Sequence, residues 1–402
     1  LAEKPHLKQS FFFTMDKKAK WIKLIREILR GEIKLHLNKN CIFYLLLILA
    51  MSCTLTASAE EWPMFRANSQ RTGNSVHNAA GADFTGRKDW TEKVPDAVRS
   101  SPAIVNDSLI FGSNNGNIYS MGLYSGMIEW TFPTGNWVVS SPAVSEGRIF
   151  VGSYDSRMYC LDAETGKMIW KFTTHNSIHS SPAVAGGVVY FGSNDGYVYA
   201  VNIKTGWQKW RFKTERAVQG SPVVSDGVVY VGNDEGKLFA LDAETGSLKW
   251  RAVVGGPIVS APAVRDGHLY FTSQDGKIYC ARIKHQAVIW NYDSKAQIET
   301  SPLVEDGKVV FGNIKGWVIS LDAMTGSVIW KYKANESVFS SPASFSGRIF
   351  FGTNSDVLVC LDGKTGSVVW RAPFDADVLT SPAIAKDRIV ITGADGKVCT
   401  LK

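Results

Sequence analysis

The stretch SPAVAGGVVYFGSNDGYVYAVNIKTGWQKWRF, residues 181–212, decides the fold of this chain. It contains four short runs rich in valine, tyrosine, phenylalanine and tryptophan, separated by Gly-Gly, Asn-Asp-Gly and Thr-Gly. Short apolar runs interrupted by such turn residues are typical of antiparallel β-hairpins. Since no apolar period of 3.6 residues is present, the stretch predicts four strands and no helix.

The same unit recurs with a period of 40 residues. Proline marks its start at Pro102, Pro142, Pro182, Pro222, Pro262, Pro302, Pro342 and Pro382. Tryptophan marks its last strand at Trp90, Trp130, Trp170, Trp210, Trp250, Trp290, Trp330 and Trp370. Neither series contains an insertion or a deletion. Four strands in about 40 residues are typical of a propeller blade, so the sequence predicts eight blades.

The two ends of the repeat complement each other. Residue 402 follows the third strand of the eighth unit, and DFTGRKDW (83–90) aligns with AETGKMIW (163–170), a fourth strand. Pairing of the two ends would remove exposed sheet edges. We therefore predict an all-β fold: a single closed eight-bladed β-propeller with four antiparallel strands per blade, in which the N-terminal strand completes the last blade.

The first 59 residues differ from the repeat in charge and hydropathy. They carry ten of the 44 Lys and Arg residues but four of the 37 Asp and Glu residues, which leaves 34 basic and 33 acidic residues for the remainder. They end in the apolar run CIFYLLLILA (41–50) and small residues up to Ala59, as in a secretory signal peptide. We predict a leader with a signal peptide at residues 1–59, a lead-in segment at 60–82 and the propeller at 83–402.

These features predict export, to the periplasm or the cell exterior, with cleavage near Ala59. An uncleaved leader or lipidation at Cys53 would instead attach the protein to a membrane, and both stay open as alternatives. The part beyond the leader is nearly neutral and has no basic block, which argues against nucleic acid as a partner. We expect a monomer.

The repeated unit resembles the PQQ-type repeat of quinoprotein-like propellers. Its Ala-x-x-Thr-Gly-x-x-x-Trp segment is similar to the tryptophan-docking motif of that family, and WPMFRANSQRTG (62–73) resembles the lead-in that precedes such repeats. The family includes quinone-dependent alcohol dehydrogenases, the outer-membrane assembly lipoprotein BamB and exported propellers without an assigned role. The resemblance implies the fold and leaves the function open.

Polar residues of the stretch LDAETGKMIWKF (161–172) look at first like a small active site. Asp162 and Thr165 recur in most units at one phase, as do the Gly and Trp that follow them. A catalytic site is normally single, so we interpret this set as turn residues and as a Trp wedge between blades. The cysteines at one repeat position are interpreted as small buried side chains: Cys160, Cys280 and Cys360.

No catalytic, cofactor-binding or metal-ligating residue is predicted. The resemblance implies that a quinone enzyme would hold PQQ with calcium above an adjacent pair of cysteines, and this sequence has no such pair. His175 and His179 lie four residues apart without a further Cys or His nearby, which is a weak pattern for zinc. No cofactor is therefore expected, and PQQ with calcium belongs to the alternative of a dehydrogenase.

The repeat breaks down at the connection that leads into each Ser-Pro, or Ala-Pro in the fifth unit. In a propeller these connections gather around one mouth of the channel. The residue two positions before the Ser of each Ser-Pro, or before the Ala of Ala-Pro in the fifth unit, varies strongly, and in the fifth unit it is Val259. A mixture of aromatic, arginine and acidic residues is typical of interaction hot spots, although loops also tolerate variation without function. The candidate partner or ligand residues are Arg99, Trp137, Val139, Tyr154, His179, Gln219, Glu299, Ile314, Phe339 and Leu379.

We therefore expect a non-catalytic, exported β-propeller that acts as a protein-interaction scaffold or binding module for a protein partner in the cell envelope. A BamB-like role in outer-membrane protein assembly is the most specific version of this hypothesis. The alternatives are a PQQ-dependent dehydrogenase or quinone-binding protein, and an ectodomain that senses a small ligand at the channel mouth.

Overall fold

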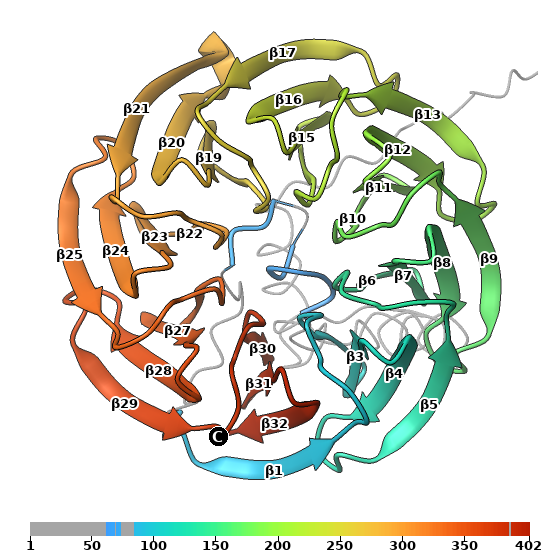
Figure 1. Cartoon of the computed structure of the whole chain (residues 1–402), viewed down its shortest axis with the longest axis horizontal. Helices are drawn as coiled ribbons and strands as arrows, with labels where there is room; N and C mark the ends of the chain where they lie inside the picture. The colour runs from blue at the N-terminus through green and yellow to red at the C-terminus, as the bar shows by residue number, and fades with distance from the viewer. Residues whose placement is uncertain (1–61, 69, 74–83, 386) are drawn as a thin grey trace, which may run out of the picture. The chain divides into compact units, whose positions relative to one another are not determined.

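The structure, a computed structural model, describes residues 62–68, 70–73, 84–385 and 387–402. The predicted leader, with its signal peptide, Cys53 and Ala59, lies outside these residues. The strands form eight four-stranded antiparallel sheets, which follow one another around a closed ring (Figure 1). The predicted eight-bladed propeller is confirmed. In the part of the chain that the structure describes, no helix is long and apolar enough to cross a membrane.

The first four blades follow one another in chain order. Blade one comprises β2 (Ala103–Val105), β3 (Ser108–Gly112), β4 (Asn117–Gly122) and β5 (Ile128–Pro133). Blade two comprises β6 (Ala143–Ser145), β7 (Arg148–Ser153), β8 (Arg157–Asp162) and β9 (Met168–Thr173). Blade three comprises β10 (Ala183–Ala185), β11 (Val188–Gly192), β12 (Tyr197–Asn202) and β13 (Gln208–Lys213). Blade four comprises β14 (Val223–Ser225), β15 (Val228–Gly232), β16 (Lys237–Asp242) and β17 (Leu248–Val253).

The remaining blades repeat this order, with one short helix in the fifth. Blade five comprises β18 (Ala263–Arg265), β19 (His268–Thr272), β20 (Lys277–Arg282), the 3₁₀ helix η1 (Ile283–His285) and β21 (Ala287–Asp293). Blade six comprises β22 (Leu303–Glu305), β23 (Lys308–Gly312), β24 (Trp317–Asp322) and β25 (Val328–Lys333). Blade seven comprises β26 (Ala343–Phe345), β27 (Arg348–Gly352), β28 (Val357–Asp362) and β29 (Val368–Pro373).

The eighth blade joins the two ends of the described chain. It comprises β30 (Ala383–Ala385), β31 (Arg388–Thr392), β32 (Lys397–Leu401) and β1 (Lys88–Lys93). In this sheet β1 lies antiparallel to β32, with Trp90 opposite Thr400 and Glu92 opposite Val398. Figure 1 shows the blue-green β1 beside the dark red β32. The prediction that an N-terminal strand completes the last blade is confirmed.

Burial within a blade follows the strand order. The second strand is almost wholly buried, as in β11, whereas the outermost strand alternates between exposed and partly buried residues, as in β13. The first hairpin of blade four turns at Asp226 and Gly227, whose φ angles are +48° and +71°. Positive φ at both central residues is what a tight hairpin of this twist requires, which explains the recurring Asp-Gly. The blades therefore bury their inner three strands and expose one outer edge.

A tryptophan on the outermost strand links each blade to the next. Trp330 donates its indole N–H to the main-chain oxygen of Gly363 at 3.2 Å, and its ring lies 2.6 Å from where a Cβ on Gly366 would stand. The same bond, 2.6–3.3 Å long, is made by Trp90, Trp130, Trp170, Trp210, Trp290 and Trp370. Among the described residues Trp250 is the exception, and it packs beside Ile283, where η1 replaces the Thr-Gly turn.

A second ring of contacts joins the blades near the channel. The main-chain N–H of each Ser that precedes Pro donates to the hydroxyl of the equivalent Ser in the next blade, as in Ser101 to Ser141 at 2.9 Å. The bond from Ser381 to Ser101, also 2.9 Å, fastens the last blade to the first. Position 261 is Ala and has no hydroxyl, so the equivalent bond from the N–H of Ser221 in blade four to blade five is missing.

The lead-in segment fills the channel, which the sequence did not predict. Trp62 pairs with Ile104 of β2, and Met64 pairs with Ala143 of β6. On the other side, the main-chain oxygen of Gly73 accepts a hydrogen bond from the N–H of Ser344 at 3.0 Å. Figure 1 shows this blue segment in the centre of the ring. Residues 62–68 and 70–73 thus act as a plug that contacts the innermost strands of the blades.

Two arginines hold the plug in place. Arg66 is 1% exposed and donates to the carbonyl oxygens of Pro302 and Pro342 at 2.8 and 2.9 Å. Arg71 is 0% exposed and donates to the carbonyl oxygen of Pro222 at 2.6 Å. Burial lowers the pKa of each guanidinium to about 9. Within the described residues neither forms an ion pair, so main-chain carbonyl dipoles, and for Arg71 also the ring of Phe65 at 5.3 Å, compensate these two buried charges.

Candidate partner site at the channel mouth

The side chains at the channel mouth are set by a simple alternation along the connections between blades. Val138 and Ser140 are fully buried, while Val139 between them faces the channel. In an extended chain successive side chains point to opposite sides, so only every second residue reaches the opening. We call the channel-facing residues two positions before each Pro-preceding Ser or Ala the mouth ring: Arg99, Val139, His179, Gln219, Val259, Glu299, Phe339 and Leu379.

The mouth ring surrounds a cavity of about 600 Å³, which we call the mouth cup. Its lining consists of the mouth ring and of Trp137, Tyr154, Gln274, Asn354 and Asp377. A smaller space of about 170 Å³, lined by the same ring, by Phe65 of the plug and by the Pro-preceding serines, lies at its base. The plug therefore gives the cup an aromatic floor.

The structure brings together nine of the ten residues that the sequence singled out. The tenth, Ile314, is not among the residues that line the mouth cup. The N–H of Ile314 is bonded to the oxygen of Gln297, so its turn lies beside the connection that carries Glu299, and Glu299 and Phe339 bound the cavity there instead. Sequence reasoning missed Gln274, Asn354 and Asp377 as lining residues. The first two occupy the repeat position of Tyr154 and the third that of Trp137, so the register of the repeat was the available signal.

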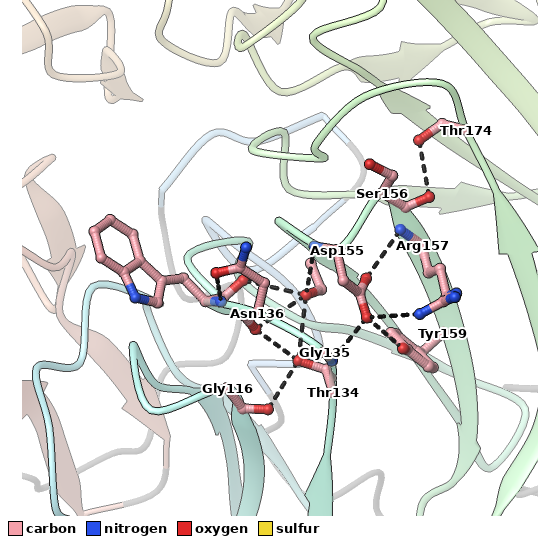
Figure 2. A network of polar contacts seen from close by, with 11 residues as sticks. Gly116, Thr134, Gly135, Asn136, Asp155, Ser156, Arg157, Tyr159 and Thr174 are labelled. Atoms are coloured by element: carbon pink, nitrogen blue, oxygen red, sulfur yellow. Dashed lines mark hydrogen bonds and ion pairs between the residues drawn. The ribbon is translucent and has the colours of Figure 1, made fainter.

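The loop that presents Trp137 is anchored by a repeated polar network (Figure 2). Asp155 accepts hydrogen bonds from the N–H of Gly135 at 2.8 Å and from the hydroxyl of Tyr159 at 2.6 Å. The hydroxyl of Thr134 donates to the oxygen of Asn136 at 2.7 Å. Asp195 and Asp275 make the same bond to the equivalent loops, to His175 and Gly255 respectively, both at 3.0 Å. The anchor is repeated, whereas the side chain it presents is not.

One arc of the mouth cup is aromatic. Trp137 is 50% exposed, and its ring centroid lies 6.0 Å from that of Tyr154, which lies 6.1 Å from that of His179. Burial lowers the pKa of His179 and raises that of Tyr154, so both are neutral at pH 7. Arg99 of the adjacent connection is exposed and forms no ion pair with any described residue. This arc offers ring faces and one cation.

The other arc carries carboxylates without counterions. Glu299 accepts a hydrogen bond from Gln274 at 3.3 Å, and Asp234, beside the cup, accepts one from Gln219 at 3.0 Å. Burial is the main cause that raises the pKa of Glu299, Asp234 and Asp377 above the ordinary values. Within the described residues none of these three carboxylates forms an ion pair.

The residues at the mouth do not fit a quinone held by calcium. Among the described residues, no group of three or more His, Cys, Asp or Glu side chains is placed to hold a metal ion. The described cysteines, Cys160, Cys280, Cys360 and Cys399, are buried inside the blades and do not line the mouth cup.

A second cavity, of about 500 Å³, lies between blades one and two, and residues of the stretch 161–172 form part of its lining. It is lined among others by Ile110, Trp130, Asp162 and Glu164. At the position of Ile110, blade three has Tyr190, whose hydroxyl bonds the next blade. The side chain of Ile110 is shorter than that of Tyr190 and leaves this cavity unfilled. Asp162 is held by the amide and hydroxyl of Thr165 at 2.9 and 2.7 Å, which agrees with its interpretation as a turn residue.

The chain shares its fold with solved propeller structures. BamB from Moraxella catarrhalis is 20% identical at a TM-score of 0.69, and the match covers 78% of this chain and 99% of that chain. A europium-containing methanol dehydrogenase is 15% identical at a TM-score of 0.75, covering 87% of this chain and 99% of that one. A quinohemoprotein alcohol dehydrogenase from Comamonas testosteroni is 14% identical at 0.74, covering 87% and 82%. At these identities the likeness establishes the fold alone, and it confirms the resemblance to quinoprotein-like propellers at that level.

Sequence comparison narrows the assignment further. No curated protein matches the chain. The family described as "Beta-alanine-activating enzyme, beta-propeller" matches residues 146–402, which is more than half of the chain. The chain therefore belongs to the β-propeller family of the beta-alanine-activating enzyme.

Proposed function

We propose that this protein is a non-catalytic, exported propeller that binds a protein partner in the cell envelope through the mouth cup. The observation that carries the proposal is the contrast within the connections between blades. The Asp anchor repeats in three of these connections and the buried flanks repeat from blade to blade, while the mouth ring of eight positions holds seven different residue types. Packing accounts for the repeated part and gives no reason for the variable part.

The composition of the mouth cup suits a protein partner. Trp137 exposes half of its surface beside Tyr154, and Phe339 and Leu379 add apolar surface to the same opening. Tryptophan, tyrosine and arginine are the residues that most often dominate the binding energy of protein interfaces. A cavity of about 600 Å³ has room for a few side chains of an inserted segment.

A BamB-like role in outer-membrane protein assembly is the most specific form of this proposal. It rests on the fold shared with BamB and on the predicted signal peptide. The dehydrogenase alternative is disfavoured because the side chains at the mouth do not form a calcium site.

Affinity capture from envelope extract tests the proposal. Trp137→Ala is expected to lose a partner that the parent protein retains, because it removes the largest exposed side chain of the cup. Trp207→Ala is the matched control, since Trp207 is 78% exposed on an outer turn away from the cup. Unchanged capture by Trp137→Ala, Phe339→Ala and Arg99→Ala would exclude the mouth. Oxidation of alcohols by the protein mixed with PQQ and calcium would overturn the non-catalytic assignment.

A further inference from the structure

One acceptor group that lines the mouth cup lacks a donor. Nine buried side-chain polar atoms of the described residues have no hydrogen-bond partner, and four of them are oxygens at a single repeat position. These are the Oδ1 atoms of Asn114, Asn194, Asp234 and Asn354, each on the turn between the second and third strands of its blade. Asn354 lines the mouth cup. The other three do not line it. A buried acceptor without a donor is costly, so Asn354 favours a donor-bearing ligand in the cup.

The carboxylates at the mouth have no counterion among the described residues. Glu299 and Asp377 line the cup, and each is half-buried without an ion pair among the described residues. Asp377 also faces the like charge of Asp356. Desolvated carboxylates gain most from an opposite charge, because the cup weakens their hydration while leaving their mutual repulsion.

The aromatic rings of the cup also favour a positively charged ligand. Trp137 and Tyr154 form the arc on blade two, and Phe339 lies on the connection to blade seven, near the carboxylates of blades six and eight. The faces of aromatic rings attract cations. Arg99 is the one cation among the lining residues, and it lies on the connection to blade one, beside the aromatic arc and not beside Glu299.

We infer that the mouth cup binds an organic cation, an alkylammonium or guanidinium group, with Glu299 and Asp377 as its counterions. This inference rests on the proposed function, and it specifies the partner as a segment that inserts a lysine or arginine side chain into the cup. An ammonium group supplies up to three N–H donors and one positive charge, which suits both the orphan acceptor of Asn354 and the unpaired carboxylates of Glu299 and Asp377. The cup excludes anionic segments by the same carboxylates.

Fluorescence anisotropy with the purified protein tests the inference. The probe is a fluorescein-labelled, end-blocked peptide of glycine and serine with one central lysine. Matched peptides carry norleucine or glutamate at the centre, which keeps the chain length and removes or reverses the charge. We expect the lysine peptide to bind about tenfold more tightly than either, as for a hydrogen-bonded charge pair. Equal binding of the norleucine peptide would overturn the inference.

Charge-removing variants locate the cation. Glu299→Gln and Asp377→Asn are each expected to weaken binding of the lysine peptide about tenfold, because each removes a counterion and keeps the shape. Glu244→Gln, on an exposed outer turn, is the matched control and is expected to bind as the parent does. Parent-like binding by both mouth variants would place the cation elsewhere and overturn the inference.

Competition with n-butylammonium separates a free amine from a protein side chain as the source of the cation. Displacement of the peptide at equal affinity supports a small amine, and much weaker displacement supports an inserted segment. The two experiments distinguish failure of the cation inference from failure of the proposed function. If Trp137→Ala loses its captured partner while the lysine peptide fails to bind, the cation is wrong and the partner site stands. If Trp137→Ala, Phe339→Ala and Arg99→Ala all keep the captured partner, the site itself is wrong.

Discussion

Carboxylates on the outer turns and carboxylates at the mouth have opposite environments. On the outer turns, Asp322 accepts hydrogen bonds from the amide and hydroxyl of Thr325 at 2.8 and 2.9 Å. These bonds hold the pKa of Asp322 below its usual range. At the mouth, burial raises the pKa of Glu299, and the donor that its carboxylate receives is one amide at 3.3 Å.

This difference in environment indicates that the outer-turn carboxylates stabilise the fold, whereas the fold does not need the mouth carboxylates. The outer-turn Asp recurs in blades two, four, six and seven, and in each its ionised form is stabilised by local donors. The mouth carboxylates do not recur, and their ionised forms cost stability. A residue that weakens the folded state and breaks the repeat is most simply explained by what it binds.

The largest expected effect compares two tryptophans. Trp330→Ala is expected to lower the free energy of unfolding by about 3–5 kcal/mol, because Trp330 is 7% exposed and fills the gap between blades six and seven. Trp137→Ala is expected to stay within about 0.5 kcal/mol of the parent, since half of its side chain is already in water. Urea unfolding measures both. Equal losses would show that the mouth is part of the packing after all.

The next effect removes one outer-turn carboxylate. Asp322→Ala is expected to cost about 1 kcal/mol, as for the loss of a side chain that caps main-chain N–H groups. Since the folded pKa of Asp322 lies below its ordinary value, its contribution is complete at neutral pH and is lost as the pH falls through the folded pKa. Thermal unfolding of the variant and the parent should therefore converge in acid. A difference that persists at the lowest pH would contradict this account.

The smallest effect has the opposite sign. Glu299→Gln is expected to raise the free energy of unfolding at pH 7 by less than about 1 kcal/mol, because it removes a desolvated charge that is still partly in water. Since the folded pKa of Glu299 is raised, the parent loses stability as the pH rises from the ordinary value of 4.5 through the folded value. Below that window the two proteins should unfold at the same temperature. A variant less stable than the parent at pH 7 would indicate a hidden cation partner.

The fold was predictable because its determinants are local and repeated eight times. Asp226 and Gly227 specify a hairpin without reference to the rest of the chain, and Trp330 specifies a wedge through a fixed spacing to Gly366. The closure by β1 was predictable for the same reason, since its residues match a fourth strand.

The contents of the channel were not predictable, because they depend on contacts across the whole ring. Arg66 reaches carbonyl oxygens 236 and 276 residues away, and no local pattern marks those oxygens as partners. The mouth cup was predictable in outline from the breakdown of the repeat. Asp377 occupies the repeat position of Trp137, so the spacing could have indicated it. The absence of Ile314 from the lining depends on how neighbouring connections pack, which spacing alone does not give.

The plug also has a consequence for the order in which the chain folds. Trp62, Arg66 and Gly73 precede every blade in the sequence, yet the partners of Arg66 and Gly73 belong to blades six and seven. The plug is synthesised before every blade, so it cannot form its contacts with blades six and seven until those blades have been synthesised. Contacts of such sequence separation are slow to form, because the intervening chain has to be ordered before they can stabilise it. We expect the ring to assemble around its own beginning, so that completing the circle and filling its centre are one event.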